Sequence, residues 1–450
     1  MLQAKIDAIM DQVEERAILA IRPYPPVDLP EVRSQLGGLP ILPAETDWPR
    51  TSDDIPLHFL ARIDCSELPE PCWALPNTGT LQFFARIDEE VVWDGKAFDY
   101  ARVLYSPSSS GRTVSAPDDL PPIMDGYHRY DRDMRLPDEP HTQIYPQWPL
   151  TFKSIRSWPM SPPIDPTSGV TWQAYREAVG RARAAEIVRT TGRPTNPMLH
   201  AEWGEYRFNR EGKGSVVLPK EGPQGAEFPQ AWILAERIAR AIACLANEEI
   251  AKLNDALERD RSPEDNPRQL LADFGALAEQ AMAWVRRAQS AGLDAPTKKA
   301  EAKEYNDWLA RVGSDERFEI TYALSRALER GMSAAIKYCG GSRKAAALVP
   351  AGYMNRLEGE HSATSPDTFG IEVSAPRRWI STEHHQLLGH APTSQDIGKR
   401  TQKDILLLHL VSDDGVDFMF CDCGEVQFWI DADDLAARKF DRIRANTEVG

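Results

Sequence analysis

Hydrophobic positions change their spacing twice along the chain. Residues 36–105 and 404–431 contain short apolar or alternating runs bounded by Pro, Asn, Asp and Gly, a pattern typical of β-strands. Between about 170 and 345, apolar residues instead recur every three or four positions, as they do on one face of a helix. The sequence therefore predicts an α+β fold: a β-rich core of two related halves with a large helical insertion.

Individual elements follow from these patterns. We expect strands in LHFLARID (57–64), TLQFFARID (80–88), ARVLYS (101–106), LTFKSIRSW (150–158), ILLLHLVSD (405–413), VDFMFCD (416–422) and EVQFWID (425–431). Gly37-Gly38 predicts a tight turn before Leu39-Pro40.

Helical spacing predicts an N-terminal helix over 1–21, in which Leu2, Ile6, Ile9 and Val13 share a face. Further helices are expected from Trp172 to about 191, in three long segments around 234–245, 270–284 and 320–336, and in a shorter segment at 298–311. A last helix is expected in DADDLAARKF (431–440), where acidic residues come first and basic residues last. The predicted organisation is 1–21 N-terminal helix, 22–169 first half of the core, 170–345 helical insertion and 346–450 second half of the core.

A short pattern occurs in both halves. GTLQFFARID (79–88) and GEVQFWID (424–431) each read Gly, any residue, aliphatic, Gln, Phe, aromatic, and each contains Ile-Asp. Either two unrelated hairpins share this pattern by coincidence or the halves are related by internal duplication, which we favour. Because strand side chains alternate between faces, Phe83 and Phe428 fall on one face and Gln82 and Gln427 on the other. Aromatic residues on the Gln face predict sheets that are covered on both sides.

The longer segments that contain this pattern resemble a known family. They read LGGLPILPAETDWPR (36–50), PLHFLARIDCSELP (56–69), LPNTGTLQFFARID (75–88), HQLLGHAPTSQ (385–395), ILLLHLVSDD (405–414) and CDCGEVQFWIDADDL (421–435). In this order they are similar to the YwqG-like family of bacterial proteins of unknown function, over roughly 36–160 and 370–445. The resemblance implies a β-rich α+β fold with two related halves, and it implies no reaction and no cofactor.

One position departs from the family pattern. Family members tend to have Trp-Gly-Asp at the closing turn, where this chain has Phe420-Cys421-Asp422-Cys423-Gly424. Asp422 and Gly424 are kept, and any role of the family's Trp is in doubt here.

Composition and charge restrict the functional classes. The 52 basic and 68 acidic residues give a formal net charge of −16, which repels phosphate backbones and anionic lipid surfaces. Six scattered cysteines in 450 residues suit a reducing compartment. No apolar run approaches the roughly 18 residues of a membrane span. We therefore expect a cytoplasmic protein that binds neither nucleic acid nor membranes.

Candidate metal and catalytic groups give weak signals. Cys421 and Cys423 have no second cysteine pair, so small packing residues are favoured over a zinc or redox site. His384, His385 and His390 lack carboxylates at metal-binding spacing, and we expect exposed or loop-bonding roles for them. The nine acidic residues of 404–435 fit turns and helix N-caps better than a calcium site. No metal and no cofactor is expected.

These observations favour a non-enzymatic binding or protein-interaction module with a cleft between the two β-rich halves. Its candidate binding residues are Trp48, Gln82, Gln395, Asp422 and Gln427, and its partner is a protein or a small ligand. One alternative is an enzyme of unrecognised type that uses polar residues in the same cleft. Another is a scaffold whose helical insertion mediates partner binding. The sequence does not indicate an oligomeric state.

Overall fold

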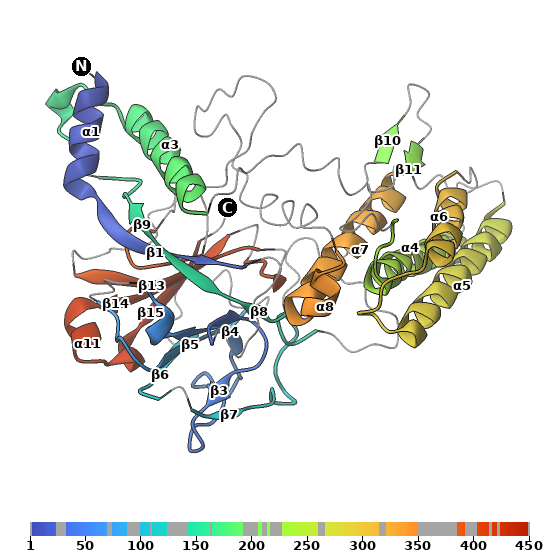
Figure 1. Cartoon of the computed structure of the whole chain (residues 1–450), viewed down its shortest axis with the longest axis horizontal. Helices are drawn as coiled ribbons and strands as arrows, with labels where there is room; N and C mark the ends of the chain where they lie inside the picture. Colours follow the sequence, from blue (N-terminus) through green and yellow to red (C-terminus); the bar gives the residue numbers. More distant parts are fainter. Residues whose placement is uncertain are drawn as a thin grey trace.

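The computed structural model has an α+β fold, with two large β-sheets at one end and a group of helices at the other (Figure 1). The structure describes residues 2–23, 33–69, 74–87, 100–108, 110–123, 142–162, 164–191, 206–208, 214–216, 227–259, 266–314, 321–349, 385–391, 403–413, 416–420 and 424–448.

The first sheet has five strands in the order β6-β5-β4-β2-β8, and every neighbouring pair is antiparallel. Its strands are β2 (Gln35–Leu36), β4 (His58–Asp64), β5 (Thr80–Ala85), β6 (Ala101–Ser106) and β8 (Trp148–Pro149).

The second sheet has six strands in the order β15-β14-β13-β12-β1-β9, again antiparallel throughout. Its strands are β1 (Glu15–Ile21), β9 (Thr151–Ser157), β12 (Gln386–Leu387), β13 (Asp404–Val411), β14 (Glu425–Asp431) and β15 (Arg444–Glu448).

The two sheets share one arrangement of strands. Strands β2, β4, β5 and β6 of the first sheet correspond to β12, β13, β14 and β15 of the second. The central pair of each sheet carries an irregularity at the same point, around Leu60 in β4 and Leu407 in β13. The predicted hairpin order is therefore the same in the two halves of the core.

Equivalent turns follow the short strands β2 and β12. Gly37 and Gly38 have φ values of 55° and 71°, and Leu388 and Gly389 have 60° and 66°. In both turns the preceding Gln, Gln35 or Gln386, donates its side-chain amide to carbonyl oxygens of the turn. The predicted Gly-Gly turn is present, and its counterpart uses a leucine in a left-handed conformation that glycine adopts more readily.

The inner faces of the two sheets pack directly on each other. Phe83 of β5 and Phe428 of β14, which occupy equivalent positions, meet edge to face with ring centroids 5.1 Å apart. Both side chains are fully buried in one hydrophobic cluster that extends through both sheets. The space between these faces is therefore filled core, and the cleft expected between the halves does not lie there.

Other elements cover the outer faces. The hairpin of β3 (Ile41–Leu42) and β7 (Arg112–Thr113) lies over the first sheet, where Leu42 packs with Phe84. Helix α3 (Trp172–Thr191) packs on β9 of the second sheet and on helix α1 (Leu2–Val13). Helix α3 thus lies within the predicted insertion range but packs with the core.

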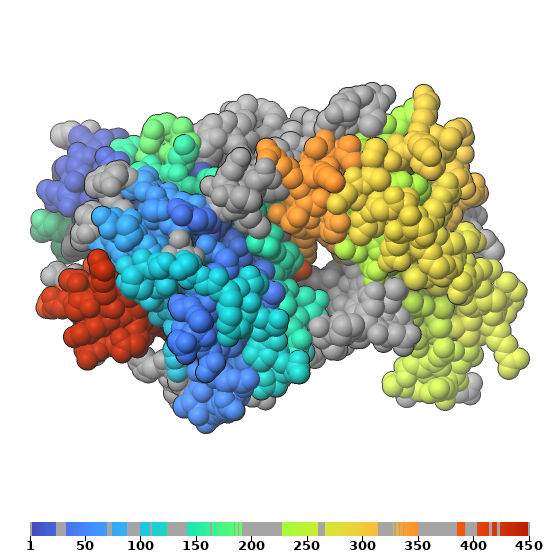
Figure 2. Space-filling model, turned by 60° about the horizontal axis from the view of Figure 1, so that its bottom comes forward, coloured from blue at the N-terminus to red at the C-terminus, as the bar shows by residue number. Residues whose placement is uncertain are grey.

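The remaining helices pack on one another. They are α4 (Trp232–Glu258), α5 (Pro267–Ala291), α6 (Lys299–Ser314), α7 (Thr321–Gly341) and α8 (Arg343–Ala346), near a small hairpin of β10 (Tyr206–Phe208) and β11 (Gly214–Val216). All helices predicted between 234 and 336 are present. Figure 2 shows α4 to α6 at the end of the molecule opposite α11 (Ala432–Ala436), with α7 on the side toward the sheets.

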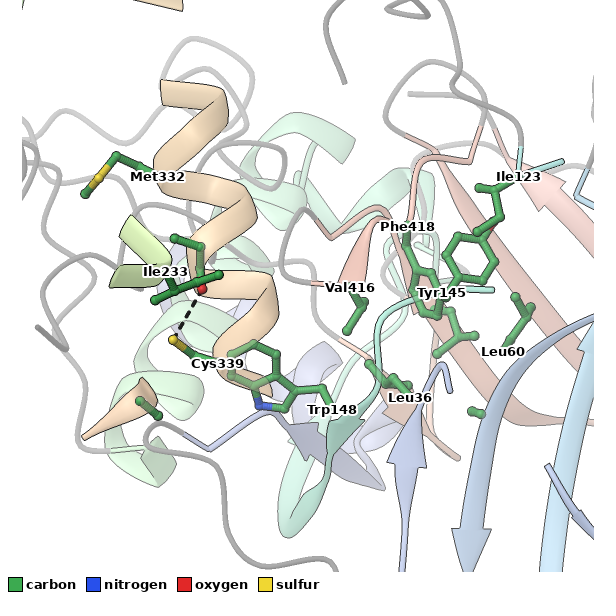
Figure 3. Close-up of a cluster of buried hydrophobic side chains, with 14 of the residues drawn as sticks. Leu36, Leu60, Ile123, Tyr145, Trp148, Ile233, Met332, Cys339, Val416 and Phe418 are labelled. Atoms are coloured by element: carbon green, nitrogen blue, oxygen red, sulfur yellow. Dashed lines mark hydrogen bonds between the residues drawn. The ribbon is translucent and has the colours of Figure 1, made fainter. Parts of the chain in front are cut away.

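The helices and the sheets form a continuous core (Figure 3). Ile233, Met332 and Cys339 belong to the same buried cluster as Leu36 and Phe418. At the end of α7, a side chain at Gly340 would overlap the Trp148 ring of β8. Lys337 of α7 also forms an ion pair with Asp417. The last turns of α7 therefore fix the helices against the sheets.

The structure corrects three predicted elements. The N-terminal helix ends at Val13 rather than 21, because residues 15–21 form β1, which lies between two other strands and is buried on both faces. In the expected strand 416–422, the described residues 416–420 form only an isolated bridge between Phe418 and Asp413. The last helix is shorter than expected, and residues 444–448 form β15, an edge strand whose polar composition (RANTE) hides it from hydrophobic patterns.

Candidate functional site

The structure places three of the five predicted binding residues. Trp48 and Gln82 lie on the outer side of the first sheet, and Gln427 lies on the outer face of the second. Gln395 and Asp422 lie outside the described residues. Because the two sheets face each other with their inner sides, Gln82 and Gln427 are not brought into one site.

Gln82 and Trp48 hold the cover of the first sheet in place. The Gln82 amide nitrogen donates to the Ile41 carbonyl oxygen at 2.7 Å, and the Ile41 amide donates back to Gln82 Oε1 at 3.1 Å. Trp48 donates its indole N–H to the Leu57 carbonyl oxygen at 2.7 Å and packs against Phe84. These contacts give both residues a structural role, and their predicted binding role stays a prediction.

Gln427 belongs to a buried polar network. Trp429 Nε1 donates to Gln427 Oε1 at 3.0 Å, and Gln427 Nε2 donates to Glu425 Oε1 at 2.8 Å. The other oxygen of Glu425 lies 2.6 Å from His409 Nε2. Burial raises the pKa of the Glu425 carboxyl, but attraction to His409 and these hydrogen bonds outweigh it, so this pKa lies below its ordinary value. The network satisfies the polar groups of a face that is closed to solvent.

The first sheet carries an arginine where the second carries His409. Arg62 pairs with Gln82 in the first sheet as His409 pairs with Gln427 in the second. The position of Glu425 is occupied by Thr80, which has no carboxylate. Arg62 is only 5% exposed, and its Nε atom has no hydrogen-bond partner. Burial lowers the pKa of this guanidinium, and the charges of Asp64 and Glu67 only partly offset that effect.

A buried ionic triad lies beside β12. Arg22 binds Asp413 in a bidentate pair with both distances 2.6 Å, and His385 Nε2 lies 2.9 Å from the same carboxylate. The Arg22 guanidinium also stacks on the Trp148 ring, 4.8 Å from its centroid. Arg22 and Asp413 are 391 positions apart in the sequence, so the triad joins the first strand of the chain to the second half of the core.

Hydrogen bonding defines the state of the triad. The Val411 amide donates to His385 Nδ1 at 3.3 Å, so Nδ1 is the acceptor and the proton of the neutral ring lies on Nε2, facing Asp413. Burial lowers the pKa of His385. Burial also raises the pKa of Asp413, but the charge of Arg22 and the two hydrogen-bond partners reduce it to far below its ordinary value. His385 is therefore a neutral donor between two strands, and the prediction of an exposed or loop-bonding side chain was wrong for it.

A related but smaller cluster occupies the equivalent place in the first sheet. There the Asp64 amide donates to Ser34 Oγ at 2.8 Å, just as the Val411 amide donates to His385. Ser34 in turn donates to Glu67 at 2.6 Å, and Arg33 lies 2.9 Å from Asp64. Arg33 is almost half exposed, whereas every member of the triad is buried. The same scaffold thus carries a partly solvated ion cluster in one half and a buried one in the other.

The described residues contain no cluster suited to a metal ion. Within the ranges given above, no group of three or more His, Cys, Asp or Glu side chains has the geometry of a metal site. Cys65, Cys244 and Cys339 are buried and form no disulfide with one another. The expectation that the protein carries no metal or cofactor stays a prediction, since part of 404–435 and the Cys421–Cys423 pair lie outside the described ranges.

Family comparison agrees with the two-part core. Residues 34–323 and 349–448 match a family model described as a domain of unknown function, DUF1963. The chain belongs to this family. The DUF1963 match includes the first sheet, every strand of the second sheet except β1, and helices α3 to α6 and α11. It agrees with the expectation of an uncharacterised family. No curated protein matches the chain.

None of the helices that the structure describes is both long enough and apolar enough to cross a bilayer.

Proposed function

We propose that this DUF1963 protein is a non-enzymatic binding module, and that its ligand site lies on the outer side of the first sheet. This proposal is based on which of the buried polar groups already have a partner within the described part of the chain. The acid–base residues His385, Asp413, His409 and Glu425 are engaged with one another, whereas the Arg62 guanidinium lacks a partner at Nε.

The ion pairs of these groups argue against catalysis by them. A general acid or base must come within hydrogen-bond distance of its substrate. The Nε2 atoms of His385 and His409 already lie 2.9 Å and 2.6 Å from carboxylate oxygens of Asp413 and Glu425, so neither atom is available to a substrate. An uncommitted hydrogen-bond donor, by contrast, is what a binding site requires.

Composition supports the proposed location and the proposed class of partner. A cytoplasmic location is supported by the six scattered cysteines of the sequence, and a partner other than nucleic acid by the net charge of −16. The YwqG-like assignment and the internal duplication are further parts of the same proposal, supported by the equivalent strands and turns of the two sheets.

A ligand search tests this function. Full-length protein purified from its expression host is examined by native mass spectrometry for a retained molecule, and by thermal shift against a library of small metabolites. We expect at least one compound to raise the melting temperature and to be recovered chemically unchanged after incubation. Conversion of a stabilising compound, abolished by His409→Gln or His385→Gln in variants that remain folded, would support the enzyme alternative instead.

A further inference from the structure

Arg62 is a buried cation with unused hydrogen-bonding capacity. A guanidinium has five N–H donors in a planar fork that matches a carboxylate or a phosphate. No acceptor within the described part of the chain binds the Arg62 fork, and its Nε is closed to solvent. Leaving a buried charged donor unpaired is costly, so an arginine at this place indicates an acceptor that the described part of the chain does not supply.

The nearest acidic residues are already in use. Asp64 Oδ1 accepts hydrogen bonds from Ser66, and Asp64 Oδ2 lies 2.9 Å from Arg33 Nε, an ion-pair distance without a hydrogen bond. Glu67 accepts hydrogen bonds from the Arg33 amide and from Ser34. These carboxylates moderate the charge of Arg62 through space but form no ion pair with it.

The second sheet shows what completes the equivalent position. There His409 replaces Arg62 and lies 2.6 Å from Glu425. Glu425 occupies the position equivalent to Thr80. The second sheet therefore has a carboxylate side chain at a position where the first sheet has none. The related half therefore serves as an internal reference for the chemistry of the first.

From this comparison we propose that Arg62 binds a carboxylate group of a small ligand, which takes the place that Glu425 holds in the second sheet. The inference rests on the proposed binding function and names its ligand class. A carboxylate fits better than a phosphate dianion, because Asp64 and Glu67 lie close to Arg62 and a second negative charge adds repulsion. Gln82, the cross-strand neighbour of Arg62, fixes the covering strand β3 above this position.

Thermal unfolding in the presence of simple anions tests the proposal. The probes are sodium succinate, sodium citrate and sodium phosphate at matched ionic strength, with sodium chloride as the reference. For the wild-type chain we expect a saturable rise in melting temperature with a carboxylate and a smaller rise with phosphate. Removing the guanidinium with Arg62→Gln is expected to raise the half-saturating concentration about tenfold or more, as for other charge-assisted pairs.

Two further variants are measured beside Arg62→Gln in the same thermal unfolding experiment. Thr80→Glu introduces the carboxylate that the second sheet has, and it is expected to abolish the anion response by occupying Arg62 from within. Arg112→Gln removes an exposed arginine of the covering hairpin and should leave the response unchanged.

The outcomes separate this inference from the proposed function. The same carboxylate response in Arg62→Gln and in the wild-type chain would overturn the site, as would a wild-type response to phosphate that equals or exceeds the carboxylate response. If the carboxylate fails but another class of compound binds unchanged, the inference is wrong and the binding function stands. Conversion of a bound carboxylate, lost in Arg62→Gln, would retain the site and overturn the non-enzymatic function.

Discussion

The two sheets have the same arrangement of strands and turns but different polar side chains on their outer faces. Their strand order, their central irregularity and their left-handed turns agree, and Phe83 and Phe428 meet in the shared core. On the outer faces, Arg62 is opposite Gln82 with Thr80 nearby, whereas His409 is opposite Gln427 and binds Glu425. Packing of inner side chains maintains the frame, while outer polar positions vary without disturbing it.

The two sheets also differ in the ionic clusters beside their short strands β2 and β12. The second sheet uses the buried triad of Arg22, Asp413 and His385, and the first uses Ser34, Glu67 and the partly exposed Arg33. Buried ion pairs tolerate the loss of one partner poorly, whereas solvated pairs contribute little. The two halves should therefore respond differently to matched substitutions, and four predictions use this difference.

The largest effect is expected where the halves are alike. Phe83→Ala and Phe428→Ala should each lower the free energy of unfolding by about 3–5 kcal/mol, because each opens a cavity in the shared core. The two rings are in contact, so the double variant should depart from the sum of the single effects by about 0.5–1.5 kcal/mol. Chemical denaturation provides the measurement.

Trp172→Ala is the control, since that ring is 49% exposed. A cost below about 1 kcal/mol for either phenylalanine, comparable to that of a surface substitution, would contradict a common core.

The ionic clusters should separate the halves. Asp413→Asn leaves Arg22 buried without its counter-charge and should cost about 3–5 kcal/mol. The matched change Glu67→Gln, in the partly solvated cluster, should cost about 1 kcal/mol or less. Urea unfolding of both variants measures the difference, and equal costs would remove the distinction between the two clusters.

Substitution of the two outer glutamines should affect different parts of the molecule. Gln82→Ala leaves the N–H and the carbonyl of Ile41 without their side-chain partner and should cost about 2–3 kcal/mol. Hydrogen exchange at the Ile41 amide should then accelerate. Gln427→Ala serves as the matched change, and it should leave exchange at Ile41 unaltered. Protection of Ile41 that survives Gln82→Ala would show that β3 is held by other contacts.

The smallest effect is a pH dependence confined to the second half. The pKa of His385 is lowered by burial, so below the unfolded value of 6.5 the unfolded chain binds a proton that the folded chain does not. Stability should therefore fall as pH decreases from 6.5 toward 5, by up to about 1.4 kcal/mol per pH unit. His385→Gln should reduce this slope. His390, whose pKa is also lowered by burial, should account for part of the remaining slope.

Asp413 acts in a separate window. Because the pKa of Asp413 is lowered, its contribution to the free energy of unfolding is present above the unfolded value of 3.8 and is lost as pH falls below it.

The His385 prediction has a clear contrary outcome. If the slope of stability against pH between 6.5 and 5 is unchanged in His385→Gln, His385 does not remain neutral in the folded chain.

The local elements and the pattern shared by the two halves were predictable from residues close together in the chain. Strands β4, β5, β13 and β14 were predictable because each is a dense apolar run bounded by turn residues, and helices α4 to α7 because their apolar residues repeat at helical spacing. The repeated Gly-x-aliphatic-Gln-Phe pattern identified Phe83 and Phe428 as equivalent before their contact was known. Such features depend on residues close together in the chain.

Tertiary structure decided the features that depend on distant neighbours. Residues 15–21 continue an amphipathic pattern, yet they form β1 because β9 and β12 hydrogen-bond to both edges of this segment. The edge strand β15 forms because β14 is its template. The ion-pair partner of Arg22 lies 391 positions away, and the significance of Arg62 appears only when Thr80 is compared with Glu425. Hydrophobic spacing reports which face of an element is buried, whereas the pairing of a buried charge depends on which segments the fold brings to that face.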